Sequence, residues 1–325
     1  MPGIRRWITR IAATLLMFLA VSSAALYILY FRRVPVPAIP IPTHARVTPP
    51  VSSLPGLAAC WIETGKTFEN FSFGSTAGSI LIKHPAGDLL IDTGSSTRFN
   101  EEIRGYPFMT WLKLRLLAGQ LTPEISLQEL LRLAGEDPAQ IRWAILSHVH
   151  LDHAGGLMDL PRLTVLLSEE ELQFAADPSV QAKGYVIAGH TKRFPPPNKP
   201  TLHFLPQPYE IFDESADLYG DGAVVVVPLP GHTPGSVGIF VNLAPRRRLF
   251  YAGDAVDDER GFQERVGKSL ILQDSDMDAV RANQIVARLS ELHQKVPDLV
   301  IIPAHGRSAY KKFFPGGPLS CVASR

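Results

Sequence analysis

The sequence lacks a second Asp-Thr-Gly or Asp-Ser-Gly, although residues 89–96 read LLIDTGSS. Aspartic proteases need two carboxylates close enough to share one proton, because two like charges a few ångströms apart do not both ionise. A single copy in a chain of 325 residues therefore excludes this class of protease. Asp92 must have another role.

Positive charge is also scarce once the N-terminus is set aside. Residues 1–33 contain five Arg and no acidic residue, whereas the rest of the chain has 27 Lys and Arg against 31 Asp and Glu, a formal net charge of −4. A nucleic-acid-binding protein needs a basic excess on one face. We therefore expect no nucleic-acid partner. The total charge leaves a polyanionic substrate open, because local clusters can differ from the total. A small-molecule substrate is expected from the motifs described below, and the oligomeric state stays open.

Cysteine is nearly absent, with only Cys60 and Cys321, close to the two ends of the globular part. Domain termini are often near each other in space, so a disulfide formed outside the cytoplasm is one interpretation. Two unrelated thiols are the alternative, and the sequence leaves the choice open.

Only one hydrophobic run is long enough to cross a bilayer. Residues 11–31, IAATLLMFLAVSSAALYILYF, are uncharged and match the roughly 20 residues that a spanning helix needs. We predict a retained single-pass anchor over residues 1–33. The alternatives are a buried helix and a signal peptide cleaved near the small residues 23–25, although the apolar run continues beyond that point.

The arginines that flank this run suggest its orientation. Three precede it (Arg5, Arg6 and Arg10) and two follow it (Arg32 and Arg33). Basic residues favour the cytoplasmic side, so we expect the globular part outside the cytoplasm, in the periplasm if the host is bacterial. Seven prolines between residues 34 and 55 predict an extended linker, and residues 56–325 then form the globular domain.

After the linker, short apolar runs alternate with helical patterns. The runs 79–84 and 89–92 flank a turn as in a hairpin, and Ser126 and Ser168 begin capping boxes of short helices. Further strands are expected at 141–148, 163–168, 223–230, 236–243, 248–254 and 298–305. Two successive strand-rich halves favour an α/β fold of two packed sheets with helices outside.

The sequence also predicts the structure of three further segments. An amphipathic helix is predicted from Met277, Val280, Val286, Leu289 and Leu292. The apolar segment 106–119 is either a core helix or a helix that lies against a membrane or over the site. Residues 183–200 are expected to form a long loop, which in compact domains is often an active-site lid.

Histidine and aspartate gather directly after the strand at 141. SHVHLDHAGG places four of them within six positions: His148, His150, Asp152 and His153. In an extended segment, side chains two residues apart point the same way, so His148 and His150 can bind one metal ion. Asp152 and His153 lie past the bend and can bind a second metal ion. Three further ligand types end other predicted strands, namely His232 in PGHTPGS, Asp254 in YAGD and His305 in PAHG.

The elements HVHLDH, PGHTPG, AGD and PAHG, in this order over about residues 60–310, resemble the metallo-β-lactamase superfamily. The resemblance implies a four-layer αβ/βα sandwich with two metals at one edge. It assigns His148, His150 and His232 to the first metal, Asp152, His153 and His305 to the second, and Asp254 as the bridge; Asp152 and Asp254 are the catalytic carboxylates. Zn²⁺ is expected, with Fe or Mn as alternatives.

The same resemblance gives Asp92 a role, since a strand that ends in Asp-x-Gly lies beside the metals in this family. Asp92 would orient the ligands by hydrogen bonds, and a plain turn-forming aspartate is the alternative. The implied reaction is attack by a metal-bridging hydroxide on an ester, lactone or thioester carbonyl. A phosphodiesterase of the same fold and a non-catalytic, membrane-tethered metal-binding or sensing domain are the alternatives.

Two positions depart from the patterns of particular branches. AGD favours the glyoxalase II, lactonase and phosphodiesterase side over the true zinc β-lactamases. Ser236 replaces the last His of the HTPGH found in glyoxalase II, and Asp257 stands where N-acyl homoserine lactonases usually have Tyr. Tyr185 is a tyrosine that could enter the site from a loop instead.

Overall fold

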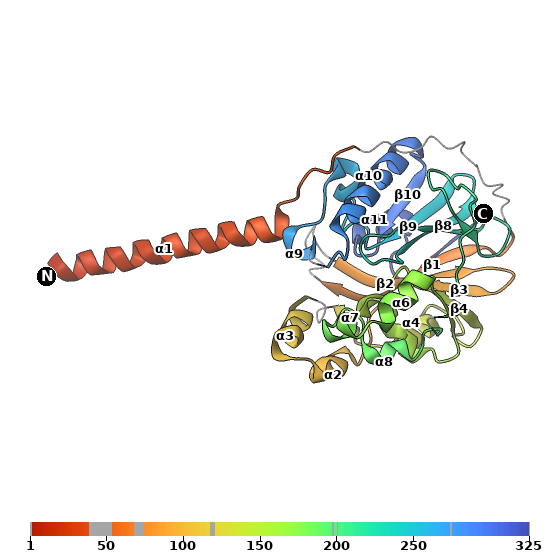
Figure 1. Cartoon of the computed structure of the whole chain (residues 1–325), viewed down its shortest axis with the longest axis horizontal. Helices are drawn as coiled ribbons and strands as arrows, with labels where there is room; N and C mark the ends of the chain where they lie inside the picture. Colours follow the sequence, from red (N-terminus) through yellow and green to blue (C-terminus); the bar gives the residue numbers. More distant parts are fainter. Residues whose placement is uncertain are drawn as a thin grey trace.

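The computed structural model describes residues 2–38, 54–67, 75–117, 121–196, 198–199, 201–273 and 275–324. Two β-sheets lie face to face with helices outside them (Figure 1). The first has the order β11-β1-β2-β3-β4-β5, with β1 Ala58–Thr67, β2 Ser75–Lys83, β3 Asp88–Ile91, β4 Ile141–Ile145, β5 Thr164–Leu166 and β11 Cys321–Ala323. The second has the order β10-β9-β8-β7-β6, with β6 Ala216–Asp217, β7 Val224–Pro228, β8 Val237–Ala244, β9 Arg247–Gly253 and β10 Leu299–Pro303.

The helices divide between the two outer layers and the N-terminus. The α-helices are α1 Pro2–Phe31, α2 Phe99–Glu102, α3 Phe108–Leu117, α4 Leu127–Leu133, α5 Leu151–Ala154, α6 Glu169–Ala176, α7 Pro178–Ala182, α8 Ala188–Thr191, α9 Leu270–Gln273, α10 Ala279–Lys295 and α11 Arg307–Phe313. Short helices of other types are η1 Ile103–Gly105, η3 Gly155–Asp159 and η4 Gly261–Arg265.

Strand β1 shows how the layers are built. Successive side chains of a strand point to opposite faces, so Ala59 and Trp61 enter the core between the sheets, while Cys60 and Ile62 enter the core beneath the outer helices. Both faces are buried, which is why such strands appear in the sequence as continuous apolar runs. The predicted four-layer sandwich is confirmed.

The helix predicted after residue 277 is α10, which covers the second sheet. Leu289 and Leu292 are buried in the same core as Phe250 of β9. Two members of the predicted apolar stripe were assigned wrongly. Asp278 is the N-cap of α10, so Met277 lies before the helix begins. Val280 lies in the first turn of α10, but its side chain is 69% exposed.

The two segments that the sequence left uncertain are now placed. Residues 108–117 form α3, and the predicted long loop at 183–200 contains the short helix α8. Most of the predicted Pro-rich linker, residues 39–53, lies outside the described residues, so the extended spacer stays a prediction. At its start, Val36 is buried and its N–H donates to Arg265 O at 2.9 Å.

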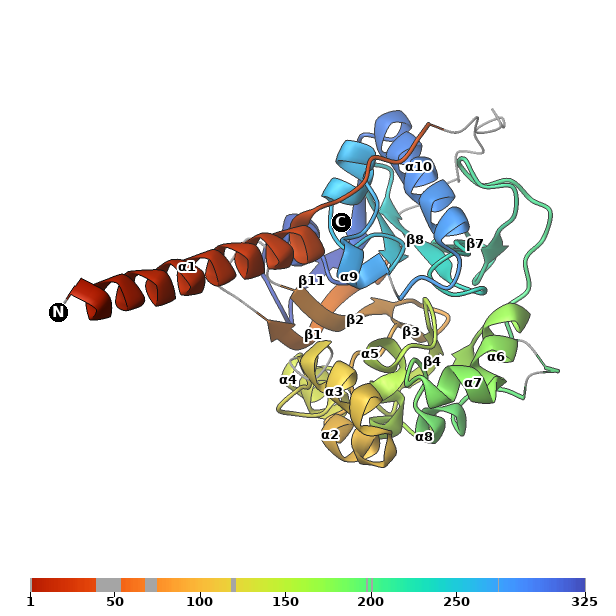
Figure 2. The same cartoon turned by 60° about the vertical axis from the view of Figure 1, so that its left-hand side comes forward.

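Helix α1 projects away from the sandwich (Figures 1 and 2). Its segment Arg10–Ile28 is long and apolar enough to cross a membrane, and none of it is buried against the protein. A signal sequence near an N-terminus has the same length and composition.

Cys60 and Cys321 form a disulfide between the paired strands β1 and β11. The choice left open by the sequence is thus decided in favour of pairing. The bond joins residues 261 positions apart, so it ties the last strand to the first strand of the domain.

We expect reduction of this disulfide to lower the free energy of unfolding by about 3–5 kcal/mol, because a cross-link over a long loop restricts the unfolded chain. Urea unfolding with and without dithiothreitol measures the change. The double variant Cys60→Ser/Cys321→Ser is the control and should not respond to the reductant. Equal midpoints for the oxidised and reduced protein would contradict the expectation.

Candidate metal centre

The seven predicted ligands come from the ends of four strands in both sheets. His148 and His150 follow β4, His232 follows β7, Asp254 follows β9, and His305 follows β10. Asp152 and His153 lie in α5, directly after the first pair. The structure brings all seven together at one edge of the sandwich, in three overlapping groups of potential ligands.

The first group consists of His148, His150 and His232, whose ligand nitrogens all lie within 4.8 Å of one another. His150 Nδ1 is 3.0 Å from His232 Nε2. All three side chains are buried. Three nitrogen atoms at this spacing match the donor set of a zinc-type ion.

The second group consists of Asp152, His153 and His305, with His305 Nε2 3.4 Å from Asp152 Oδ2. Asp254 contacts both groups: its Oδ2 lies 3.5 Å from His232 Nε2 and 3.4 Å from His305 Nε2. This carboxylate therefore occupies the position that a ligand shared by two cations requires.

Buried atoms without partners test whether these residues suit metal ions. The described part of the chain offers no hydrogen-bond partner to the Nε2 atoms of His148 and His150, and His153 Nε2 and Asp254 Oδ1 have each other at 3.3 Å. Leaving buried polar atoms unpaired is costly, so they indicate a group that the protein residues do not supply. Aromatic nitrogens and carboxylate oxygens converging in this way fit two divalent cations, although the ligand assignments remain predictions.

Neighbouring acceptors fix the orientation of three imidazoles. The Nδ1 atoms of His153, His232 and His305 lie 2.7–2.8 Å from Asp92 Oδ2, Asp276 Oδ1 and Thr76 O. In a neutral imidazole that donates its Nδ1 proton to such an acceptor, Nε2 keeps a lone pair directed into the site. This tautomer is the one that binds a metal through Nε2.

Asp92 is fully buried and accepts four hydrogen bonds. The donors are Ser147 N, Ser147 Oγ, His153 Nδ1 and Tyr251 OH, at 2.6–2.7 Å. Its φ of 54° places it in the left-handed region, and Gly94 after it also has a positive φ. A Cβ on Gly94 would lie 2.0 Å from Thr64 Oγ1, so the turn of the LLIDTG string requires glycine there.

Asp276 and Lys268 were not predicted from the sequence. Lys268 Nζ lies 2.5 Å from Asp276 Oδ1 and 2.9 Å from His232 Nδ1, and all three side chains are largely buried. A single Asp and a single Lys in a loop form no motif that could be recognised in the sequence. They approach His232 because the loop before α10 folds back onto it.

Burial and carboxylates together set the charge of the site. Burial lowers the pKa of His148 and His150 well below the usual value, so both are neutral, as metal binding requires. Burial also opposes protonation of His305, but the carboxylates of Asp254 and Asp152 outweigh it and raise its pKa to about 9. The part of the site around Asp254 thus attracts positive charge.

The two branch-specific departures have structural explanations. Asp257 accepts a hydrogen bond from Ser269 N and lies 3.5 Å from Arg33 Nη2, so it helps to hold the chain after α1 against the domain. Ser236 Oγ bonds to Thr233 within its own loop. Tyr185 does reach the site, since its ring stacks on His150 with centroids 5.5 Å apart.

Glu171 joins the two loops that carry the first group. One oxygen accepts Val149 N at 2.8 Å, and the other accepts Thr233 Oγ1 at 2.7 Å and Gly235 N at 3.0 Å. Burial raises the pKa of Glu171 to about 7, although these three bonds favour the ionised form. Its side chain thereby sets the distance between His148 and His150 on one loop and His232 on the other.

We expect Glu171→Gln to weaken metal retention about 10–100-fold, because an amide offers an acceptor on only one side and turns an N–H₂ towards protein donors on the other. Chelator competition measures the affinity. Glu169→Gln, in the same turn but exposed, is the matched control and should change nothing. Unchanged metal affinity in Glu171→Gln would show that Glu171 does not set the loop spacing.

Known proteins match both the sequence and the fold. The model of the metallo-beta-lactamase superfamily matches residues 77–305. N-acyl homoserine lactonase AttM of Agrobacterium fabrum (strain C58) is 28% identical over 236 residues, which cover 72% of this chain and 82% of AttM. The acyl-coenzyme A thioesterase MBLAC2 of Homo sapiens is 28% identical over 193 residues, which cover 58% of this chain and 61% of MBLAC2.

Two solved structures share the fold. An N-acyl homoserine lactone hydrolase with N-hexanoyl-L-homoserine bound at its metal center has a TM-score of 0.54 and 20% identity, covering 78% of this chain and 95% of that chain. AiiA of B. thuringiensis with N-decanoyl-L-homoserine bound has a TM-score of 0.53 and 19% identity, with the same coverage. At such identities the likeness establishes the common architecture.

Proposed function

The chain belongs to the metallo-beta-lactamase superfamily, and we propose that it hydrolyses a lactone, ester or thioester carbonyl at the centre built around Asp254. The predicted class of metal-dependent hydrolase is confirmed by this membership and by its relatives among lactonases and a thioesterase. The observation that supports the site is the contact of Asp254 with both ligand groups, next to buried nitrogens that lack protein partners.

Each set of residues has a distinct task in this proposal. His148, His150 and His232 hold one divalent cation, Asp152, His153 and His305 hold the other, and Asp254 places negative charge between them. When bound, the cations polarise a carbonyl and lower the pKa of a water molecule. Asp92, Asp276 and the carbonyl of Thr76 keep the imidazoles aligned.

The substrate proposal follows from the relatives and from the wall of the site. AttM is named for N-acyl homoserine lactones and MBLAC2 for acyl-coenzyme A, and both compounds carry an acyl chain on a carbonyl. Beside His150 lie Tyr185 and Phe174, with ring centroids at 5.5 and 6.1 Å. The Tyr185 ring is only partly buried and offers an apolar surface to an acyl chain, while Phe174 packs in the core behind it.

Metal analysis combined with a substrate panel tests this function. The panel contains N-acyl homoserine lactones, an aryl ester, an acyl-coenzyme A thioester and bis-p-nitrophenyl phosphate. We expect two metals per chain and hydrolysis of at least one carbonyl compound. Metal loading without any turnover would identify a binding domain, and turnover of the phosphodiester alone would overturn the carbonyl assignment.

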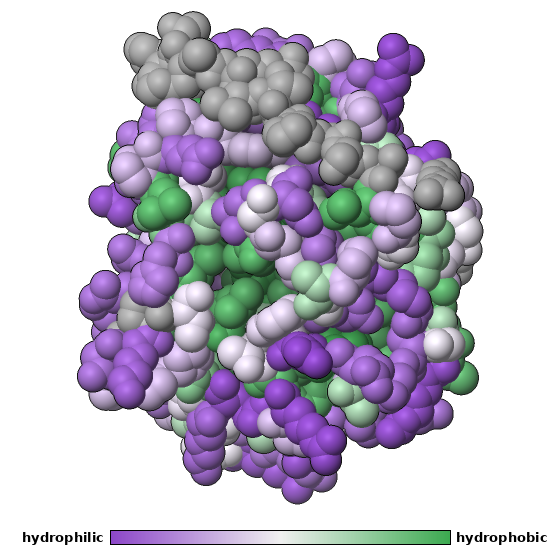
Figure 3. Space-filling view, turned by 90° about the vertical axis from the view of Figure 1, so that its right-hand side faces the viewer, coloured by the Kyte–Doolittle hydropathy of each residue, from purple (hydrophilic) through white to green (hydrophobic). Residues whose placement is uncertain are grey.

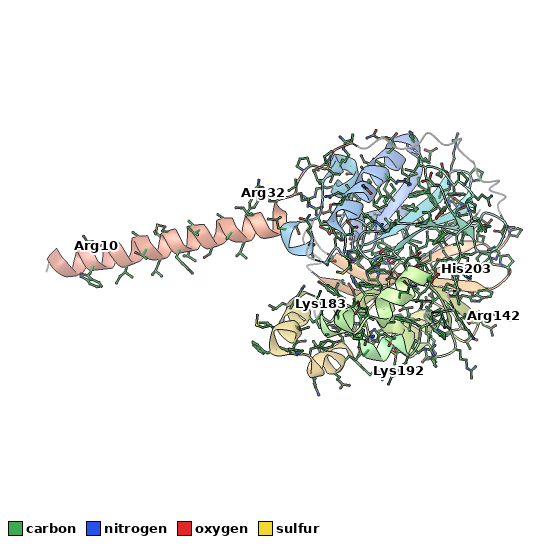
Figure 4. All side chains as sticks on the ribbon, viewed as in Figure 1. Arg10, Arg32, Arg142, Lys183, Lys192 and His203 are labelled. Carbon is green, nitrogen blue, oxygen red and sulfur yellow. A yellow bond between two sulfur atoms is a disulfide. The ribbon has the colours of Figure 1, made fainter. Side chains whose placement is uncertain are left out.

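For the location we infer a retained N-terminal anchor with the domain outside the cytoplasm. Arg10 and Arg32 mark the two ends of the apolar part of α1 (Figure 4). The disulfide favours an oxidising compartment. The intact mass of the protein and its resistance to alkaline carbonate extraction test the anchor, because a cleaved signal peptide leaves a lighter, extractable protein.

A further inference from the structure

The end of α1 is fastened directly to the domain. Arg33 Nη2 lies 2.8 Å from Asp258 Oδ2 and 3.5 Å from Asp257 Oδ2, and its side chain is only 10% exposed. Just beyond, Val36 N donates to Arg265 O at 2.9 Å, and Arg265 Nε donates to Val36 O at 3.0 Å. These ion pairs and backbone bonds hold residues 33–36, directly after α1, against the domain.

Helix α3 exposes large apolar side chains. Phe108, Met109 and Leu116 are 68%, 70% and 62% exposed, whereas Leu114 is buried. Met109 and Leu116 are seven residues apart, close to two full turns, and so lie on the same face of the helix, with Phe108 beside them. Removing each such side chain from water is worth about 1.5–3 kcal/mol, which is enough for the three together to hold a helix at an apolar surface.

The side of the domain on which α3 lies is the side from which α1 leaves. In Figure 1 α3 lies at the left-hand edge of the domain, below the C-terminal end of α1, and Figure 2 again places it below that end. Helix α9, next to the end of α1, exposes Leu270 by 39% and Leu272 by 40%. On the opposite face, hydrophilic residues surround a hydrophobic hollow (Figure 3).

Basic side chains accompany these apolar ones. Lys113 and Arg115 of α3 are exposed, and so is Lys183, which lies on the same side of the domain (Figure 4). Apolar residues interleaved with Lys and Arg are typical of helices that lie in the headgroup region of an anionic bilayer.

We propose that α3, together with α9, lies in the headgroup region of the bilayer that α1 spans, so that the domain rests on the membrane in one fixed orientation. This inference rests on the proposed retention of α1 as an anchor. The partner is a phospholipid surface, because the spanning segment leaves from the same side and the exposed side chains pair apolar area with positive charge.

This surface is one layer of side chains away from the metal centre. A Cβ on Gly184 would lie 2.7 Å from Leu114 Cδ1, so α3 packs directly on the segment that carries Tyr185. Lys113 Nζ lies 5.3 Å from the centroid of the Tyr185 ring, and this ring also stacks on His150. The proposed membrane surface therefore lies close to His150, with only the Tyr185 ring between Lys113 and that imidazole.

Site-specific fluorescence on the full chain tests the proposal. An environment-sensitive probe is attached to Met109→Cys, with Leu116→Cys as a second position on α3. Leu19→Cys reports on α1, and His203→Cys is the control on the side of the domain away from α1 (Figure 4). The native cysteines are joined in the disulfide and do not take the label. Each labelled protein is reconstituted into phosphatidylethanolamine–phosphatidylglycerol vesicles that contain nitroxide lipids.

We expect the nitroxide lipids to quench the probes at 19, 109 and 116 and to leave the probe at 203 unquenched. Quenching at 19 without quenching at 109 and 116 would overturn the docking of α3 while the anchor stands. Absence of quenching at all four positions would overturn the anchor and the docking surface together. Hydrolysis of the substrate panel is measured on the same samples. Absence of hydrolysis would contradict the proposed function, whatever the quenching shows.

Discussion

Replacement of Asp254 by Asn is expected to lower kcat/KM by about 10³-fold while the fold is retained. The amide has nearly the same shape, but it removes the negative charge that lies 3.4–3.5 Å from both His232 and His305. Removal of one preorganised hydrogen-bond donor from an active site already costs about 10²–10³-fold, and a carboxylate shared by two cations contributes at least as much.

Steady-state kinetics and metal content, measured on the same preparation, check this expectation. Asp213→Asn is the matched control, because Asp213 lies on the surface with about half of its side chain exposed. An Asp254→Asn enzyme with wild-type kcat/KM and two bound metals would show that the charge between the two groups is unimportant. The proposed mechanism would then have to be abandoned.

Asp92 offers the second large effect, and two substitutions separate its contributions. Asp92→Ala leaves the four donors of Ser147, His153 and Tyr251 without an acceptor, and alanine is strained at a φ of 54°. We expect the free energy of unfolding to fall by about 3–5 kcal/mol, because buried donors lose their partner. Asp92→Asn tolerates this backbone conformation, so its loss of stability should be smaller.

The asparagine variant isolates the effect of the charge on the metal centre. Without the carboxylate, the Nδ1 proton of His153 has a weaker acceptor, and we expect metal affinity or activity to fall about 10–100-fold. Urea unfolding and chelator competition measure the two quantities. Asp88→Asn, at the other end of β3, serves as the control. Equal metal affinity in wild type and Asp92→Asn would reduce Asp92 to a turn residue.

The candidate ligands that the sequence singled out, and that the structure brings together, were recognisable for a local reason. His148, His150, Asp152 and His153 lie within six positions, so their proximity is set by the chain itself. His232, Asp254 and His305 could be found because each follows an apolar run that composition identifies as a buried strand. The ends of such strands meet at one edge of a sandwich.

The interactions that the sequence did not predict all depend on long-range contacts. Glu171 appeared only as a capping residue, yet its two oxygens join loops that are more than 80 residues apart. Asp276 reaches His232 from a distance of 44 positions. Asp257 stands where lactonases usually have Tyr, and only the folded structure shows that its carboxylate lies beside Arg33.

What the sequence by itself determined is the chemistry: which side chains can bind a metal, which runs are buried strands, and which segment is apolar enough for a membrane. These properties belong to residue types and their spacing. The tertiary structure alone decided which carboxylates orient the imidazoles, that Cys60 meets Cys321, and that α1 and α3 share one side of the domain. Such facts depend on how distant segments pack, and no local pattern specifies them.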